Sequence, residues 1–144
     1  GTGQGLACHA MAGSQIAVLA EAQLDDSQRI RVTRLVAVAD IGRVINPDIA
    51  RQQIEGGLLF GMAAATGNAV HITRGVAGPL RLRELGLPKL GDMPEISVEL
   101  VASNAAPGGA GELGVPAVAP AIANAIFAGS GRRIRSLPLS PANF

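Results

Sequence analysis

Alternating apolar and polar positions predict a β-hairpin in the first third of the chain. Apolar side chains recur at every second residue in segments 15–24 and 29–40, which is the period of a half-buried strand. Residues 25–28 between them, Asp-Asp-Ser-Gln, favour a turn. Near the end of the second segment, residues 35–38 are apolar on both faces. This pattern predicts a sheet that is covered on both sides at that end.

A helix is predicted to begin after the hairpin, at Asn46. Asn46 is a favourable N-cap, Pro47 suits the first helical position, and Asp48 complements the positive end of the helix dipole. Apolar residues then recur every four positions as far as Met62 and form one buried stripe. Three glycines interrupt the helix, and each costs about 1 kcal/mol relative to alanine. We expect another backbone, most simply that of the sheet, or a ligand to lie against them. The glycines are Gly56, Gly57 and Gly61.

The rest of the chain predicts two more strands, a second helix and a closing edge strand. Residues 69–72 form a short strand candidate, and an irregular crossing follows over 75–91. Residues 94–101 alternate cleanly, 118–128 carry a helical apolar stripe, and 133–139 end the chain as an edge strand. The order of elements predicts an α+β fold, a mixed sheet with two main helices packed on it. We expect residues 1–144 to form one domain.

Composition excludes several classes of function. The chain has 144 residues, 48% of them hydrophobic and 16% charged, with a formal net charge of +1. That is enough apolar material for a core, and the charge is too nearly balanced for binding a nucleic-acid backbone. Aromatic residues make up 2%, with no Trp or Tyr, so there is no platform for stacking bases. No apolar run reaches the roughly 18 residues of a membrane span.

The single cysteine and the N-terminal residues bear on metal binding and on the cellular compartment. One cysteine, Cys8, excludes an internal disulfide and a multi-cysteine metal site. It is most simply a small buried side chain. The sequence opens on Gly1 without an initiator methionine or a signal pattern, which suggests a fragment of a longer protein. Its compartment, cytoplasmic or periplasmic in a bacterium, therefore stays open.

The stretch 107–116 is the strongest candidate for chemistry. It reads Pro-Gly-Gly-Ala-Gly-Glu-Leu-Gly-Val-Pro, so the main chain there can approach a ligand closely. Its N–H groups could form an anion-binding nest in front of the following helix. Glu112 is the one carboxylate in it, and an apolar pocket would raise its pKa toward that of a general base. The simpler interpretation is a glycine-rich turn whose glutamate caps the helix.

The other candidates in the sequence are weaker. The segment 1–5, Gly-Thr-Gly-Gln-Gly, misses the spacing of a phosphate or dinucleotide loop. His9 and His71 have no partners at the spacing of a metal site or a catalytic triad, and we interpret both as structural. The sequence predicts no metal-ligating residues.

Several motifs taken together resemble the molybdenum hydroxylases, the xanthine dehydrogenase and aldehyde oxidase family. The resemblance rests on residues 108–116 and their helical continuation, on Asp-Ile-Gly-Arg-Val-Ile-Asn-Pro at 40–47, and on Gln-Ile-Glu-Gly-Gly at 53–57. Met-Pro-Glu-Ile at 93–96 and Gly-Arg-Arg-Ile-Arg-Ser-Leu-Pro at 131–138 are most similar to the isoquinoline 1-oxidoreductase beta-subunit branch. The motifs resemble the C-terminal part of the molybdopterin-binding large subunit, and they cover nearly the whole chain.

This resemblance implies a cofactor site and a role for each matching residue. Glu112 would be the base that takes a proton from the hydroxyl group on molybdenum. Gln53 and the backbone of Gly109, Ala110 and Gly111 would contact the cofactor. The cofactor implied is molybdenum bound to molybdopterin cytosine dinucleotide, and the substrate an aromatic N-heterocycle or an aldehyde. Electrons would leave through a small partner subunit that carries 2Fe–2S clusters.

Three functions remain open on the sequence alone. In the first, the chain contributes Glu112 and cofactor contacts to an oxidoreductase completed by the remainder of the large subunit, and is inactive alone. In the second, the same fold serves as a non-catalytic structural or interaction module. In the third, the glycine-rich loop binds a generic anion or small molecule. A pterin dinucleotide needs several loops to bury it, and this chain offers two at most.

Overall fold

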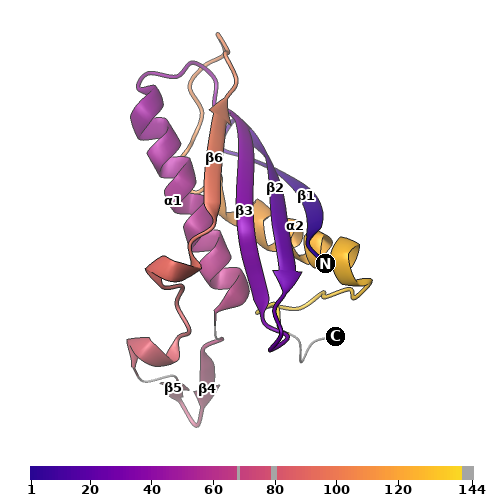
Figure 1. The fold of residues 1–144 in the computed structure, drawn as a ribbon. Coiled ribbons are helices and arrows are strands. Elements are labelled where there is room, and N and C mark those ends of the chain that lie inside the picture. The colour runs from indigo at the N-terminus through magenta and orange to yellow at the C-terminus, as the bar shows by residue number, and fades with distance from the viewer. Residues whose placement is uncertain (68, 79–80, 141–144) are drawn as a thin grey trace.

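A four-stranded sheet carries both long helices of the chain on one face. The computed structural model describes residues 1–67, 69–78 and 81–140. The sheet has the order β1-β2-β3-β6, in which β6 is parallel to β3 and the other neighbours are antiparallel (Figure 1). Its strands are β1 Gly3–Met11, β2 Ser14–Leu24, β3 Ile30–Asp40 and β6 Glu95–Leu100. The helices are α1 Pro47–Thr66 and α2 Val115–Ser130. The predicted α+β fold with a mixed sheet is confirmed.

The predicted hairpin corresponds to β2 and β3. Its turn closes as expected, because the backbone N–H of Asp25 donates to the carbonyl of Arg29 at 2.9 Å. The register shifts between Glu21 and Ala22, which pair with Arg34 and Val32, and this shift marks a bulge at Thr33 on β3. Side chains that alternate along both strands, among them Val18 and Leu35, point to the helical side and are fully buried there. The core therefore lies between one face of the sheet and the two helices.

The start of α1 is the one predicted from the sequence. The side-chain oxygen of Asn46 accepts a hydrogen bond from the backbone N–H of Ile49 at 3.1 Å, and Pro47 occupies the first helical position. The stripe Ile54, Leu58 and Met62 is buried in the core. A capped N-terminus followed by a stripe with a four-residue period thus placed this helix correctly.

Two of the three glycines in α1 lie against the start of α2. A Cβ built on Gly61 would lie 2.6 Å from the carbonyl oxygen of Val115, and one on Gly57 would lie 3.5 Å from the Cα of Gly114. The expected close backbone is therefore present, but it belongs to the other helix and not to the sheet. A Cβ on Gly56 would meet no atom of the described residues within 4 Å.

The N-terminal glycines also have a packing role. Gly3 and Gly5 lie on β1 beneath α2, and a Cβ on either would overlap the backbone of that helix. Glycine at these two positions lets helix and strand approach each other. The segment is a strand and not a nucleotide loop, in agreement with the sequence interpretation.

The end of the chain differs from the prediction. Residues 133–139 are all described, and they form no strand. The segment returns instead to the end of α1, where the backbone N–H of Leu139 donates to the carbonyl of Ala65 at 2.7 Å. Its side chains bind α2: the Arg133 guanidinium donates to the side-chain oxygen of Asn124 at 2.6 Å and lies 3.7 Å from the centre of the Phe127 ring. The backbone bond is thus to a helix end and not to a sheet edge.

Helix α2 and the segment between the two helices agree with the predictions in type and differ from them in their bounds. α2 begins at Val115 and ends at Ser130, against the predicted 118–128, and its C-cap Gly131 has a positive φ of 73°. The strand predicted at 69–72 corresponds to β4 His71–Thr73, which pairs with β5 Val76–Gly78 in a small ribbon. The irregular crossing that follows holds two short 3-10 turns, Leu82–Glu84 and Leu90–Asp92.

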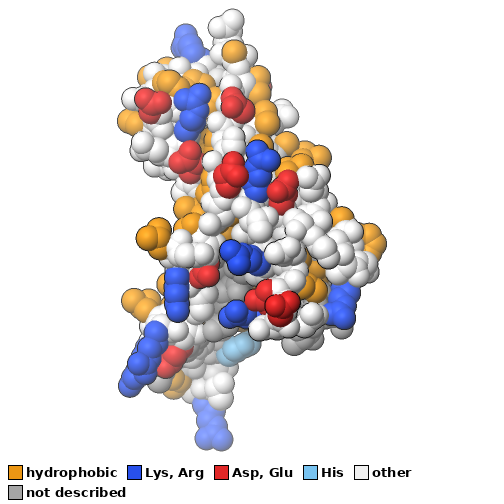
Figure 2. Space-filling view, in the orientation of Figure 1, with side chains coloured by type: hydrophobic (Ala, Val, Ile, Leu, Met, Phe, Trp, Pro, Cys, Tyr) orange, Lys and Arg blue, Asp and Glu red, His pale blue; other side chains and the backbone are white. Residues whose placement is uncertain are grey.

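Only one face of the sheet is covered by the described residues. On the other face Leu6 is 57% and Val38 is 45% exposed, whereas the sequence predicted cover on both sides. Figure 2, in the orientation of Figure 1, shows apolar side chains among charged ones on the surface of the molecule. Cys8 is exposed, because it lies on β1 with its side chain on this open face, so the prediction of a buried cysteine was wrong. None of the helices described is long and apolar enough to cross a membrane.

Candidate functional site

The glycine-rich loop runs from β6 to α2 and is held by the backbone of two distant segments. The N–H of Gly108 donates to the carbonyl of Ile41 at 2.9 Å. The N–H of Gly109 donates to the carbonyl of Ala12, in the turn between β1 and β2, also at 2.9 Å. These two N–H groups are used within the protein, so the predicted anion nest is wrong for this part of the loop.

The second half of the loop contains main-chain N–H groups that donate no hydrogen bond within the described residues. Among the described residues, the N–H groups of Ala110, Gly111 and Glu112 reach no acceptor. The next backbone bond is that of Val115, whose N–H donates to the carbonyl of Glu112 at 3.0 Å as α2 begins. Donors that remain available for a ligand thus lie around Glu112 and not at the start of the loop.

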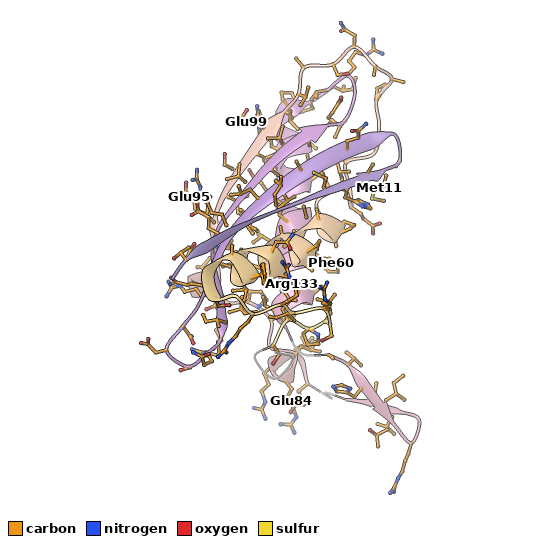
Figure 3. All side chains as sticks on the ribbon, turned by 90° about the vertical axis from the view of Figure 1, so that its right-hand side faces the viewer. Met11, Phe60, Glu84, Glu95, Glu99 and Arg133 are labelled. Carbon is orange, nitrogen blue, oxygen red and sulfur yellow. The ribbon has the colours of Figure 1, made fainter. Side chains whose placement is uncertain are left out.

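A cleft of about 530 Å³ opens beside this part of the loop. It is enclosed by the end of β1, one face of α1 and the start of α2, and its size is that of a small-molecule site. Gln53 from α1 and Glu112 from the loop both line it, although they are far apart in the sequence. Met11 and Phe60, which form an apolar part of its lining, are labelled in Figure 3.

Two glycines in the cleft have no packing explanation within the chain. Gly56 and Gly111 both line it, and a Cβ on either would meet no atom of the described residues within 4 Å. Gly109, in contrast, lies against the β1–β2 turn, with its built Cβ 2.9 Å from the Cβ of Ala12. Glycine at a position with empty space in front of it is suited to a close approach by a ligand.

The structure brings together three of the five predicted site residues. Gln53, Gly111 and Glu112 line the cleft, whereas Gly109 and Ala110 do not. Glu112 is exposed, so this chain does not itself supply the apolar pocket that the sequence analysis assumed around the carboxylate. The carboxylate thus lines the same cleft as Gln53, while its role as a base stays a prediction.

Sequence reasoning missed several side chains of the cleft, among them His9 and Phe60. His9, which we had interpreted as structural, lines it from β1. Phe60 lies on the same face of α1 as Gly56 and is 69% exposed, an unusual position for a large aromatic side chain. The one signal for Phe60 was that it falls outside the buried stripe of its helix. Nothing local to His9 indicated a site.

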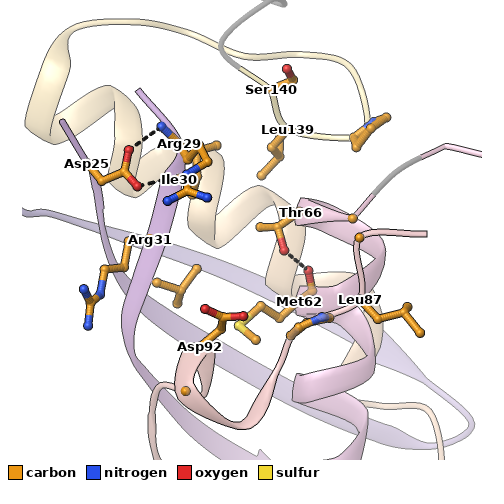
Figure 4. Close-up of a pocket in the computed structure, with 16 residues that line it drawn as sticks. Asp25, Arg29, Ile30, Arg31, Met62, Thr66, Leu87, Asp92, Leu139 and Ser140 are labelled. Carbon is orange, nitrogen blue, oxygen red and sulfur yellow. Dashed lines mark hydrogen bonds and ion pairs between the residues drawn. The ribbon is translucent and has the colours of Figure 1, made fainter. Parts of the chain in front are cut away.

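A second cavity lies toward the other end of α1. It measures about 480 Å³, and Met62, Thr66 and Leu139 form part of its wall (Figure 4). At its rim Asp25 accepts hydrogen bonds from the backbone and side chain of Arg29, and the backbone bond above all holds the pKa of Asp25 below its usual value. None of the predicted site residues lies here. Among the described residues, no three His, Cys, Asp or Glu side chains cluster as a metal site.

Comparison with known proteins now identifies the family. Residues 2–94 match the family described as the molybdopterin cofactor-binding domain, which is more than half of the chain. The chain belongs to this family. The predicted relationship to the molybdenum hydroxylases is thereby confirmed.

Relatives of this molybdopterin cofactor-binding domain are oxidoreductases much longer than the chain. It is 32% identical to the isoquinoline 1-oxidoreductase beta subunit of Brevundimonas diminuta over 99% of the chain and 18% of that protein. It is 36% identical to a membrane-bound aldehyde dehydrogenase of Gluconacetobacter polyoxogenes, named for pyrroloquinoline quinone, over 76% of the chain and 14% of that protein. The chain therefore spans less than a fifth of the length of these relatives.

A solved structure has the same fold. Quinoline 2-oxidoreductase from Pseudomonas putida 86 superposes with a TM-score of 0.82, covering 90% of this chain and 18% of that one at 23% identity. At this level of identity the match concerns the architecture alone. The arrangement of sheet, helices and glycine-rich loop in the molybdopterin cofactor-binding domain is thus one that a larger oxidoreductase contains.

The residues of the cleft fit one side of a pterin cofactor. A pterin is flat with hydrogen-bonding edges, and the uncovered surfaces of Gly56 and Gly111 leave room for a flat group to approach the main chain. The Gly111 N–H and the Gln53 carboxamide offer hydrogen bonds beside that space. One open cleft is too little to enclose a dinucleotide, so these residues would form one wall of its site.

Proposed function

We propose that this chain forms one wall of a molybdopterin site in an oxidoreductase, with Glu112 as the general base. The observation that carries the proposal is the convergence of Gln53, Gly56, Gly111 and Glu112 on a single cleft. All four residues lie in motifs that match the family, and packing within the chain accounts for neither glycine. A loop that binds a generic anion, or that binds nothing, would not require Gln53 and Gly56 of α1 to line the same cleft as Glu112.

The chain's own residues have distinct tasks in this proposal. The carboxylate of Glu112 accepts a proton from the attacking oxygen at one of its own oxygens. The carboxamide of Gln53 and the N–H of Gly111 bind and orient the cofactor through hydrogen bonds. Bound molybdopterin would supply the metal centre that accepts two electrons from the substrate. Because Glu112 is exposed here, its desolvation would come from the ligand and polypeptide that cover the cleft.

The finer assignments follow the family and the lining of the cleft. We infer an aromatic N-heterocycle or an aldehyde as substrate, the cytosine dinucleotide as the form of the cofactor, and a small subunit with 2Fe–2S clusters as electron acceptor. Met11 and the exposed ring of Phe60 give the cleft an apolar side that suits a flat ring. The isolated chain is expected to have no turnover, because its cleft is open on the side that the remainder of the large subunit would close.

The test is a Glu112→Gln substitution in the full-length large subunit, assembled with its small subunit. We expect kcat for isoquinoline or benzaldehyde to fall by about 100-fold or more while molybdenum content stays at the wild-type level. Glu99→Gln is the matched control, because Glu99 is an exposed glutamate on β6 far from the cleft (Figure 3). Activity of the Glu112→Gln enzyme within a few-fold of wild type would refute the assignment.

The same preparation separates the alternatives. Assembled protein without molybdenum, in which Glu112→Gln changes nothing, would identify a structural or interaction module. If the cofactor released from the protein is a quinone and not a pterin, the proposed molybdopterin site is wrong. The chain would then belong to an enzyme of the quinone type named for the aldehyde dehydrogenase relative. A generic anion could bind only at the N–H groups of Ala110, Gly111 and Glu112, since those of Gly108 and Gly109 are already bonded to carbonyls.

A further inference from the structure

We propose that the turn between β1 and β2, Ala12 and Gly13, together with Ser14 at the start of β2, is a positioning element for the loop that carries Glu112. The turn acts through two contacts, Ala12 with Gly109 and Ser14 with Gly108. This inference rests on the proposed role of Glu112 and goes beyond it, because it makes Gly109 a contact of the fold and not of the cofactor. It predicts which second substitution repairs a damaged loop.

The first contact is between Ser14 and Gly108. Ser14 is 2% exposed, and its hydroxyl group is buried without a hydrogen-bond partner among the described residues. A Cβ built on Gly108 would lie 2.2 Å from that hydroxyl oxygen and 3.0 Å from the backbone of Gly13. The loop can therefore lie this close to the turn only with glycine at position 108.

The second contact is between Ala12 and Gly109, and it combines a hydrogen bond with a steric limit. Ala12 has a φ of +50°, a conformation that a residue with a side chain rarely adopts and that costs about 1 kcal/mol. In this conformation its carbonyl accepts the N–H of Gly109 at 2.9 Å. A Cβ on Gly109 would lie 2.9 Å from the methyl carbon of Ala12, and the next atom, the Ala12 oxygen, is 3.8 Å away. The methyl group of Ala12 is thus the one close obstacle to a side chain at position 109.

Glu112 lies between two fixed points of the loop. One is Gly109, held by Ala12, and the other is Leu113, which directly follows Glu112 and is 1% exposed in the core. Between them no main-chain N–H of the described residues is bonded, so a displacement at Gly109 is passed on to the carboxylate. β1 also supplies His9 and Met11 to the wall of the cleft, so the turn connects that wall to the loop.

The test is a double-mutant cycle in the full-length, assembled enzyme. Gly109→Ala should lower kcat by about 10- to 100-fold, since a misplacement of about 1 Å at a reacting group has an effect of this size. Adding Ala12→Gly removes the obstructing methyl group, and kcat should return to within about threefold of the Ala12→Gly single variant. KM should change little in any of them. Gly91→Ala is the matched control, because a Cβ there meets no described atom within 4 Å.

A second measurement, on the same assembled enzyme, does not depend on activity. Amide hydrogen exchange at positions 108 and 109, whose N–H groups are bonded to Ile41 and Ala12, should be at least tenfold faster in Gly109→Ala than in wild type, and the double variant should restore protection. Two results would overturn the proposal: a Gly109→Ala variant that behaves as wild type in both measurements, or a double variant as impaired as Gly109→Ala. The latter would assign Gly109 to direct contact with the ligand. If Glu112→Gln keeps full activity, the proposed function fails, and the exchange data still decide the role of the turn.

Discussion

Gly56 and Gly61 lie five residues apart on α1, and replacing each by alanine should change stability in opposite directions. At Gly61 the new methyl group would lie 2.6 Å from the carbonyl oxygen of Val115 and 3.1 Å from the Cβ of Val118. A backbone oxygen cannot rotate away as a flexible side chain can, so α1 and α2 must separate. At Gly56 the methyl group meets no described atom within 4 Å.

The magnitudes follow from two opposing effects. Alanine in place of glycine inside a helix stabilises it by about 1 kcal/mol, because glycine loses more backbone entropy on folding. At Gly56 only this effect acts, so Gly56→Ala should stabilise the chain by about 0.5–1 kcal/mol. At Gly61 overpacking costs about 2–3 kcal/mol, and the helix preference offsets about 1 kcal/mol of it. The net destabilisation is therefore about 1–2 kcal/mol, and the two variants differ by about 1.5–3 kcal/mol.

The assay is urea unfolding of the isolated chain, followed by circular dichroism, for the wild type and both variants. The midpoint should rise for Gly56→Ala and fall for Gly61→Ala at an unchanged slope, since neither substitution alters the surface exposed on unfolding. In thermal unfolding the two Tm values should differ by roughly 6–12 °C. A Gly61→Ala variant as stable as wild type would show that the α1–α2 contact tolerates a side chain, and would refute the packing argument.

Three further predictions concern the rest of the fold. Asn46→Ala removes the side-chain acceptor for Ile49 at the start of α1 and should cost about 1 kcal/mol in urea unfolding. Asp25→Asn should destabilise the chain at pH 7, because hydrogen bonds to the ionised carboxylate, first of all from the Arg29 backbone, lower its pKa in the folded state. That difference should be constant above about pH 5 and shrink as the pH falls below the ordinary value of 3.8, which unfolding at pH 7, 4 and 3 will measure. Cys8 should react fully with a thiol reagent in the native chain, and protection until denaturant is added would contradict its exposed position on β1.

Local signals were sufficient for the hairpin and for α1. The turn at 25–28 and the alternation on either side identify the paired strands, since hairpin contacts are close in sequence. Asn46 and Pro47 mark the helix start through short-range hydrogen bonding and a preset backbone angle. These features depend on residues within a few positions of one another, so no knowledge of the tertiary structure is needed.

The predictions that were wrong depend on long-range contacts. Residues 133–139 mix apolar and polar side chains and were predicted to be an edge strand, yet Ile134 and Leu139 are buried against the helices and not in the sheet. The apolar residues indicate that parts of the segment are buried, and they do not indicate which element covers them. The error at Cys8 has the same origin, because the local sequence does not show that its strand, β1, lies at the edge of the sheet with one open face.

The candidate site could be predicted only in part. The family motifs singled out Gln53, Gly111 and Glu112, and the fold then brings these residues to one cleft. The anion nest failed because the carbonyl that accepts the Gly109 N–H belongs to Ala12, in another part of the chain. His9 was missed for the same reason, since its place in the cleft comes from strand pairing and carries no local sequence signal.

A glycine that serves packing within the chain can be distinguished experimentally from a glycine that faces a ligand. Gly56 is the clearest candidate for a glycine that faces a ligand. It weakens α1, yet nothing in the described chain uses the space that it leaves. If a cofactor occupies that space, Gly56→Ala should stabilise the isolated chain and still lower the molybdenum content of the assembled enzyme, by about tenfold for a backbone contact that a methyl group blocks. A residue with a purely structural role would not show this combination, because a loss of packing lowers both the stability of the chain and the molybdenum content of the enzyme. Full molybdenum content in a Gly56→Ala enzyme would place the cofactor away from α1 and would leave the cleft to the substrate.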